Sequence, residues 1–433
     1  MRGIRCPHAL VLSTASLPVA VLCADGVDRK IIVPATRGHP QEERIMSMFR
    51  VQLSAVFLLL GFACIPHIAS ATQQGATYVG SKQCQKCHQK ISKEWKQTLH
   101  AQMATDVSRD PNAIVGDFDT PSEIRTFTRD QVLYTIGNQW KQRYITQIGD
   151  ELYVLPAQYD LETGNWTPYH ADNWKERPWL KNCGGCHVTG LDYEKRVFIE
   201  PAVGCEACHG PGSKHAAETN ADKFAETITN PANLSVGLQV QVCGSCHTRG
   251  KDPSGKHGYP VGFKPGMSLV NKYNTATPEN SKKKFWPNGH SKSHHQQYID
   301  WQKSAHAKEG VTCISCHTVH NTGAATRYQT RLPGDKLCLN CHTPRANPTL
   351  SHSLHDMNGC IGCHMAKIVK SAVSGDLHDH TFIVVQPKDS ITHGGVDKQA
   401  NSCNACHHHK DDDPAVLQQA LDNVKGRQSS KGE

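Results

Sequence analysis

Hydrophobic and polar positions along this chain predict few regular elements. Three stretches are rich in β-branched and aromatic residues: 131–136, 141–148 and 151–158. They predict a small antiparallel β-hairpin or three-stranded sheet. Residues 414–425 show an amphipathic pattern that starts at Pro414, which predicts a terminal helix. Residues 248–300, rich in Gly, Pro, Lys and His, predict a surface loop. We therefore expect a mainly α fold of short helices and long loops.

The composition changes this picture, because the chain is poor in residues that build a core. Only 38% of its 433 residues are hydrophobic and 6% are aromatic, whereas it has 19 Cys and 27 His. A domain of this length ordinarily buries a large aliphatic core. We therefore expect non-protein groups to fill the interior.

The N-terminus predicts export. Residues 46–71 have the pattern of a secretory signal peptide: Arg50, an apolar run over 51–63, and a small-residue cleavage site at 69–71. The run is too short to span a membrane. Residues 1–45 are then interpreted as a mis-annotated upstream extension from a start codon placed too early; the alternative is that residues 1–25 are the signal. We expect a periplasmic or extracellular protein without a transmembrane span in its mature chain.

All sixteen cysteines beyond the signal lie in C-x-x-C-H motifs. The eight motifs are Cys84/Cys87/His88, Cys183/Cys186/His187, Cys205/Cys208/His209, Cys243/Cys246/His247, Cys313/Cys316/His317, Cys338/Cys341/His342, Cys360/Cys363/His364 and Cys403/Cys406/His407. In an exported chain, so many cysteines would ordinarily indicate disulfides, but the spacing indicates covalent haem attachment. Two thiols bond the porphyrin edge, and the following His ligates the iron. A zinc site or a thioredoxin-like pair is the alternative for a single motif. Eight motifs predict eight covalently attached c-type haems, packed closely enough to form the core.

The second axial ligand decides what each haem can do. Sixteen His remain outside the motifs and the first 71 residues, against four Met, so bis-histidine ligation is the economical interpretation. The element Trp-x4-His-Ala recurs at 95–101 and 301–307, each time beside a motif. The candidate distal ligands are His100, His170, His215, His295 (or His294), His306, His320, His355 and His393. We expect His257, His408 and His409 to have other roles.

The motif spacing divides the mature chain. Residues 72–182 hold the first motif and the sheet, 183–300 three motifs and the loop, and 301–433 four motifs and the terminal helix. The first-Cys spacings of 22 and 38 residues recur as 22 and 43, which suggests two related halves. The formal net charge of +8 balances haem propionates and does not indicate nucleic-acid binding.

These features resemble the multihaem c-type cytochromes, the octahaem and decahaem electron-transfer proteins distantly related to the nitrite reductase and hydroxylamine oxidoreductase lineage. The matching residues are 78–80, 95–101, 142–145 with 155–156, 182–190, 204–213 and 295–313. The resemblance implies electron transfer in anaerobic respiration, between redox proteins such as a membrane quinol dehydrogenase and an outer-membrane conduit.

The sequence departs from that lineage in one respect, since it has no C-x-x-C-K motif of the kind that holds the catalytic haem of nitrite reductases. An electron carrier is therefore favoured over an enzyme. The alternatives are a reductase of nitrite, hydroxylamine or tetrathionate at one open haem, with a Lys or Tyr of 248–300 in place of a distal His, and a filament in which a His of one subunit ligates a haem of the next.

Overall fold

The computed structural model describes residues 74–324, 327–342, 359–371 and 375–429. The chain divides into compact units 1–66 and 67–433, and every described residue belongs to the second. The predicted signal peptide, the upstream extension and His355 lie outside the described residues. No helix in the described part is long and apolar enough to cross a bilayer.

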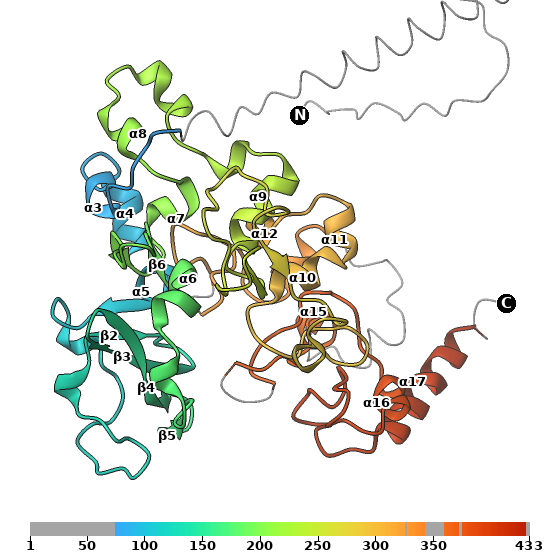
Figure 1. The fold of residues 1–433 in the computed structure, drawn as a ribbon. Coiled ribbons are helices and arrows are strands. Elements are labelled where there is room, and N and C mark those ends of the chain that lie inside the picture. The colour runs from blue at the N-terminus through green and yellow to red at the C-terminus, as the bar shows by residue number, and fades with distance from the viewer. Residues whose placement is uncertain (1–73, 325–326, 343–358, 372–374, 430–433) are drawn as a thin grey trace, which may run out of the picture. The chain divides into compact units, whose positions relative to one another are not determined.

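One antiparallel sheet of five strands lies in the first part of the described chain (Figure 1). Its strands, in spatial and chain order, are β1 (Ala104–Asp106), β2 (Tyr134–Ile136), β3 (Lys141–Ile148), β4 (Glu151–Asp160) and β5 (Asn165–Pro168). The three central strands confirm the predicted ones. The prediction of only a hairpin or three strands was wrong, because β1 and β5 have three and four residues and carry no alternating pattern long enough to detect.

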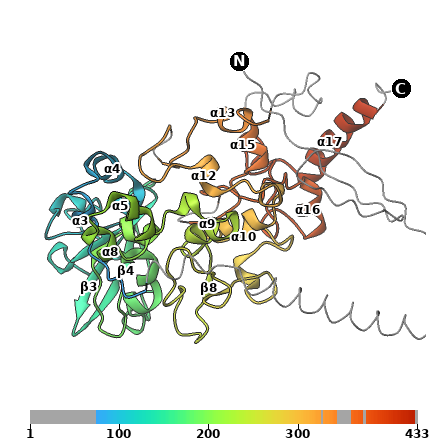
Figure 2. The same ribbon diagram turned by 90° about the horizontal axis from the view of Figure 1, so that it is seen from above.

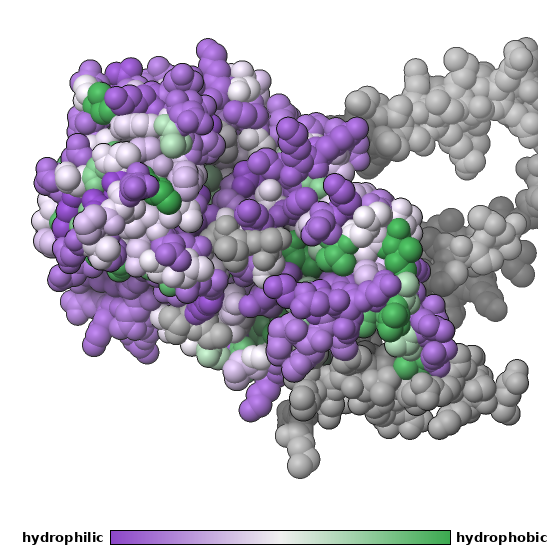
Figure 3. Space-filling model, turned by 90° about the horizontal axis from the view of Figure 1, so that it is seen from below, coloured by the Kyte–Doolittle hydropathy of each residue, from purple (hydrophilic) through white to green (hydrophobic). Residues whose placement is uncertain are grey.

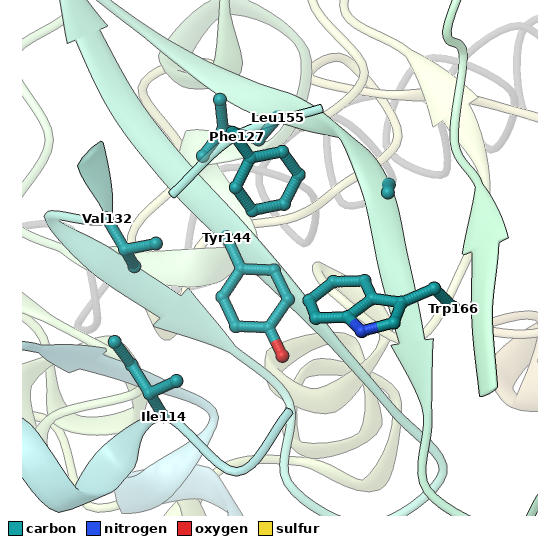
Figure 4. Packing of buried hydrophobic residues seen from close by; sticks show 7 residues of the cluster. Ile114, Phe127, Val132, Tyr144, Leu155 and Trp166 are labelled. Carbon is teal, nitrogen blue, oxygen red and sulfur yellow. The ribbon is translucent and has the colours of Figure 1, made fainter. Parts of the chain in front are cut away.

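The sheet has an aromatic core on one face. Tyr144 on β3 and Trp166 on β5 pack with Phe127 (Figure 4). Phe118 packs against the same rings, and the ring centroids of these four residues lie 5.2–5.9 Å apart. Tyr144 is completely buried. These edge-to-face and tilted contacts are the arrangements that aromatic quadrupoles favour. This part of the interior is therefore filled by side chains.

The opposite face of the sheet packs on the second motif. Ile145, which follows Tyr144 and so points the other way, is also completely buried. It belongs to a cluster with Val154, Trp179 and Leu180, and Cys183 packs against this cluster. The sheet is thus covered on both faces, and it fixes the position of the segment that leads into the second motif.

Short helices carry seven of the eight motifs. They are α3 (Ser81–Cys84), α6 (Gly185–His187), α7 (Cys205–His209), α9 (Val236–Gly244), α12 (Cys313–Cys316), α13 (Lys336–Leu339) and α15 (Gly359–His364). The eighth motif lies in turns. The further α-helices are α4 (Gln89–Trp95), α5 (Leu99–Gln102), α8 (Ser213–Ala217), α10 (Gln297–Gln302), α11 (Ala305–Lys308), α16 (Pro387–Thr392) and α17 (Pro414–Ser429). The prediction of short helices near the motifs is confirmed, and α17 confirms the predicted terminal helix.

Minor elements complete the described chain. Two small sheets pair β6 (Val188–Thr189) with β7 (Glu200–Pro201) and β8 (Gly250–Lys251) with β9 (Asn274–Thr275). Single helical turns lie at Pro111–Ala113, Arg129–Gln131, Trp174–Glu176, Leu180–Gly184, Ala221–Glu226, Pro231–Asn233 and Lys282–Lys284. The described chain contains both helices and sheets, so the expectation of a mainly α fold was wrong. Figure 2 shows α9 beside α10 and α16 beside α17.

Residues 248–300 are rich in loops, as predicted, but they do not simply cover the surface. Tyr259, Tyr273 and Trp286 are nearly fully buried, and the Tyr259 hydroxyl donates a hydrogen bond to the carbonyl of Leu180 at 3.0 Å. On the face shown in Figure 3, the described surface is mainly hydrophilic and apolar side chains occupy limited areas.

Candidate haem-binding sites

The motifs share a local geometry that their spacing dictates. The carbonyl of the first Cys accepts the backbone N–H of the motif His at 2.8–2.9 Å in the motifs of His88, His247, His317 and His342. This single turn places the two thiols, three residues apart, on one side, with the His directly after them. All sixteen cysteines are free thiols in the structure.

Five motif His each face a second His ring. The pairs and their centroid separations are His88–His215 (6.2 Å), His247–His100 (6.1 Å), His209–His320 (6.0 Å), His317–His380 (6.4 Å) and His342–His306 (5.8 Å). A metal ion bonds an imidazole nitrogen at about 2.0–2.1 Å, so two axial imidazoles on one ion have centroids roughly 6 Å apart. The donor set fits an iron between the members of each pair.

Hydrogen bonds at the ring Nδ1 orient several of these imidazoles. Nδ1 of His209 and of His317 each lies 2.8 Å from a backbone carbonyl, that of Thr229 and of Tyr328. Nδ1 of His380 lies 3.1 Å from the carbonyl of His378. A carbonyl at Nδ1 requires the proton there and leaves Nε2 as the electron-pair donor, which is how metal-bound His is usually held.

Burial favours the neutral form of three of the haem-region imidazoles, those of His100, His380 and His187. It lowers the pKa of His100 and of His380 to about 4, and nearby His charges add to the effect. Burial and then the charge of Arg143 lower the pKa of His187 to about 4. A neutral imidazole is the form that binds a metal, so no proton has to be displaced at neutral pH.

The repeated Trp-x4-His-Ala element has one structure at both positions. Thr98 and Ser304 are completely buried N-caps of α5 and α11, and each hydroxyl donates to the carbonyl of the preceding Trp at 2.7 and 2.6 Å. The same oxygens accept the backbone N–H of Ala101 and of Ala307. The cap fixes the short helix, and the helix presents its second residue, the His.

Among the described residues, the predicted distal ligands His170, His295 and His393 have no ring contact with a motif His. His170 lies against Tyr169 in a pocket beside Cys183. His295 lies beside His294, with their Nδ1 atoms 2.9 Å apart, and the pKa of His295 is well lowered by burial first and by charges that include His187 and His247. His393 bonds the carbonyl of Asp389 through Nδ1 at 2.8 Å.

His380 pairs with His317 but is absent from the predicted ligands. It lies 63 residues after its partner and has no Trp or tight loop beside it, so neither signal used to choose candidates marks it. The one feature of the sequence that stands out here is the pair of His in His378-Asp379-His380. In the structure, Nδ1 of each of these two His bonds a backbone carbonyl.

Thiols of different motifs meet across the fold. Three hydrogen-bonded thiol pairs join the first and third motifs (Cys84, Cys205), the second and fourth (Cys186, Cys246) and the fourth and fifth (Cys243, Cys313). The bond raises the pKa of the first member of each pair and lowers that of the second, for Cys205 to about 7. In a haem-bound chain these sulfurs are thioethers, so their positions carry over and their pKa values do not.

In four further pairs of motifs, a cysteine of one motif lies close enough to raise the pKa of a cysteine of the other. Burial raises the pKa of Cys208, Cys316, Cys338 and Cys363, and the next contribution comes from Cys246, Cys341, Cys360 and Cys406, respectively. Hydrogen bonds agree with this order: Asp335, before the sixth motif, accepts the backbone N–H of Cys360 at 2.8 Å, and Ser81 accepts that of Cys205 at 3.0 Å. The motifs therefore follow one another as 1–3–4–5–6–7–8, and the second branches from the fourth.

The second motif lies among half-buried cations. The guanidinium of Arg143 lies 3.9 Å above the ring of Tyr169, and Arg249 donates from Nε to the carbonyl of His294 at 3.1 Å. Burial lowers the pKa of both arginines. Neither forms an ion pair with a carboxylate of the described residues. Half-buried guanidinium groups favour anionic partners, and haem propionates are groups of that kind.

Comparisons with known proteins agree with this geometry. Residues 305–347 match the doubled CXXCH motif family, and residues 83–123 and 164–210 match the family of cytochrome c554 and c-prime. The solved structure of the outer cell wall cytochrome OcwA is 27% identical over 81% of this chain and 88% of its own, with a TM-score of 0.67. An undecahaem cytochrome from the S-layer of Carboxydothermus ferrireducens is 20% identical over 81% of this chain and 61% of its own, with a TM-score of 0.48. The motifs, the facing imidazoles, the two family matches and the likeness to OcwA together show that the chain belongs to the multihaem c-type cytochromes and binds haem covalently.

Proposed function

We propose that this chain is an octahaem electron-transfer protein whose haems are closely packed and bis-histidine ligated. The observation that carries the proposal is the set of five motif His that face a second His across a gap of one metal ion. Such ligation closes both axial positions, which favours electron transfer over substrate binding. Each haem, when bound, supplies a one-electron iron couple.

The chain's own residues would hold and tune the groups. The sixteen motif cysteines would form the thioether bonds, and the eight motif His would be the proximal ligands. The distal ligands that the geometry supports are His215, His100, His320, His380 and His306. For the motifs of His187, His364 and His407 the proposed ligands remain among His170, His295, His355 and His393.

The proposed location is outside the inner membrane, in the periplasm or at the cell surface. The predicted signal peptide supports export, and the relative OcwA is described as an outer cell wall protein. A redox donor such as a membrane quinol dehydrogenase and an acceptor such as an outer-membrane conduit would be the partners, in anaerobic respiration. The chain provides the spacing, the ligands and the dielectric.

Low-temperature electron paramagnetic resonance tests the proposal on the oxidised protein. Bis-histidine ligation at all eight sites gives only low-spin ferric signals. A high-spin ferric signal that amounts to one or more haems per molecule would contradict closed coordination throughout.

The cations at the second motif favour one second candidate, a reductase of an oxyanion such as nitrite or tetrathionate; hydroxylamine, which is not an anion, would gain nothing from them. Arg143 and Arg249 lack carboxylate partners in the described chain, and residues 248–300 contribute Arg249, His294 and His295 to this region. Two half-buried guanidinium groups could hold an anion beside the haem. Steady-state turnover with a viologen donor tests it: Arg143→Gln should lower turnover, and an unchanged low rate in both proteins would exclude this activity.

A further inference from the structure

The surface around the first motif is strongly basic. Residues 81–97 contain five lysines, Lys82, Lys86, Lys90, Lys93 and Lys96, and all five are exposed. The single carboxylate of this stretch, Glu94, is half-buried. None of the five ammonium groups forms an ion pair within the described residues, and only Lys96 has a side-chain partner, Gln85 at 3.0 Å.

The first motif is also open to solvent at its reactive edge. Cys87 is one of two exposed motif cysteines, and His88 and Ile91 are exposed beside it. The other exposed cysteine, Cys341, directly precedes residues outside the description. A haem held at Cys84 and Cys87 would therefore have an edge near solvent, and lysines would surround that edge.

The first motif is, in addition, an end of the series. Its described thiol contact with another motif is to the third, through Cys84 and Cys205, and α3 packs against α7 (Figure 1). Three backbone amides, those of Val79, Gly80 and Gly212, donate to the buried carboxylate of Glu206 at 2.7–3.0 Å and hold the two motifs together. An electron that enters at the first motif could thus pass to the third.

We propose that the lysines around the first motif form the docking surface for an acidic redox protein that exchanges electrons with this end of the series. The inference rests on the proposed electron-transfer function. It adds the haem at which electrons enter or leave, and the charge of the partner's surface. Charge complementarity steers diffusional encounter and can raise association rates by about ten- to a thousandfold at low ionic strength. Because the five lysines all lie within residues 81–97, one acidic surface on the partner protein could contact them together.

The test uses the purified holoprotein and a reduced acidic [2Fe–2S] ferredoxin as the probe. Two double variants are compared: Lys90→Glu/Lys93→Glu on α4, and Lys282→Glu/Lys283→Glu, an exposed pair in the segment after β9. Both change the net charge equally. Second-order reduction rates are measured by stopped flow across ionic strength, and direct binding of oxidised ferredoxin is measured by calorimetry.

We expect the wild-type rate to fall as salt rises, and the Lys90/Lys93 variant to lose at least about tenfold in rate and affinity at low salt. The Lys282/Lys283 variant should lose less than about twofold, a general charge effect. Equal losses in both variants would overturn the proposal, as would a salt-independent wild-type rate.

Excess dithionite separates this proposal from the proposed function. If the haems of every protein are fully reduced by dithionite, a selective loss with ferredoxin is a docking effect; haems that dithionite cannot reduce would instead contradict electron transfer itself. Sedimentation tests a second copy as the occupant, because Asp411–Asp413 near the eighth motif are exposed and acidic. The acidic-protein proposal would be overturned if the wild type forms a salt-sensitive dimer, the Lys90/Lys93 variant does not form it, and that variant still reacts with ferredoxin at the wild-type rate.

Discussion

At the scale of single residues, the account depends on how each imidazole is held. A carbonyl at Nδ1 of His209, His317 or His380 fixes the proton on Nδ1 and leaves Nε2 free to bind a metal. Sequence reasoning identified the motif His because the cysteines mark them. It missed His380 because a distal ligand is chosen by folding across the chain, and nothing in its immediate neighbours records which motif it will face.

Replacing His380 should open one site. In His380→Ala the ring opposite His317 is lost, so one haem per molecule should become high-spin in the ferric state, which electron paramagnetic resonance quantifies. The matched control is His257→Ala, a buried His packed against Tyr193 and Tyr259. It should leave the spectrum unchanged. A low-spin spectrum for His380→Ala would remove this His from the ligand set.

A buried carboxyl group should make stability depend on pH. Burial and then the charge of Asp379 raise the pKa of Asp300 from 3.8 to about 7, and Ser291 donates to its carboxyl at 2.8 Å. Between these two values the folded chain keeps a proton that the unfolded chain releases. The free energy of unfolding should therefore fall as pH rises from about 4 to 7, by up to about 1.4 kcal/mol per unit.

Asp300→Asn provides the comparison, because the amide cannot lose a proton. Denaturant unfolding of the holoprotein across this pH range should give a flatter profile for Asp300→Asn than for the wild type. Parallel profiles would show that Asp300 does not titrate in this range.

At the scale of elements, the sequence predicted the parts with strong local signals and missed those that depend on partners. Strands β2, β3 and β4 and helix α17 follow from alternation and from Pro414. The edge strands β1 and β5 form because β2 and β4 offer them hydrogen-bonding edges. Segments of three or four residues are too short for their own pattern to predict such pairing. The loop of 248–300 was placed on the surface by its composition, although Tyr259 and Trp286 are buried.

The aromatic core predicts that the sheet forms without haem while the motif helices do not. Tyr144, Phe127 and Trp166 fill their own space, whereas α12 and α13 have four residues each, far fewer than an isolated helix needs. Hydrogen exchange on haem-free protein, made without the haem attachment machinery, should show protection over 141–160 and none over 313–316 and 336–339. Equal exchange in all three segments would contradict this division.

The same core should be sensitive to truncation. Trp166→Ala removes a ring that contacts Phe118, Phe127, Tyr144 and Tyr159, so unfolding of the holoprotein should become easier by about 3–5 kcal/mol. Val270→Ala, at a side chain 75% exposed, is the control and should change the free energy by less than about 0.5 kcal/mol. Denaturant midpoints provide the measurement, and equal midpoints would show that this cluster adds little.

At the scale of the whole molecule, the eight motifs form a branched series rather than eight separate sites. The motif count could be derived from the sequence, because every Cys after residue 71 belongs to one. Their spatial order could not, since the third motif contacts the first across 121 residues, between Cys84 and Cys205. The two related halves suggested by the motif spacing share one local structure, the matching N-caps of α5 and α11.

The mass of the intact protein, purified after export, tests the central claim most directly. Thioether bonds survive denaturation, so the denatured chain should weigh as much as its polypeptide plus eight haem groups, with no thiol left to alkylate. A mass without haem, an increment of fewer than eight, or cysteines that still react with an alkylating reagent would contradict the account.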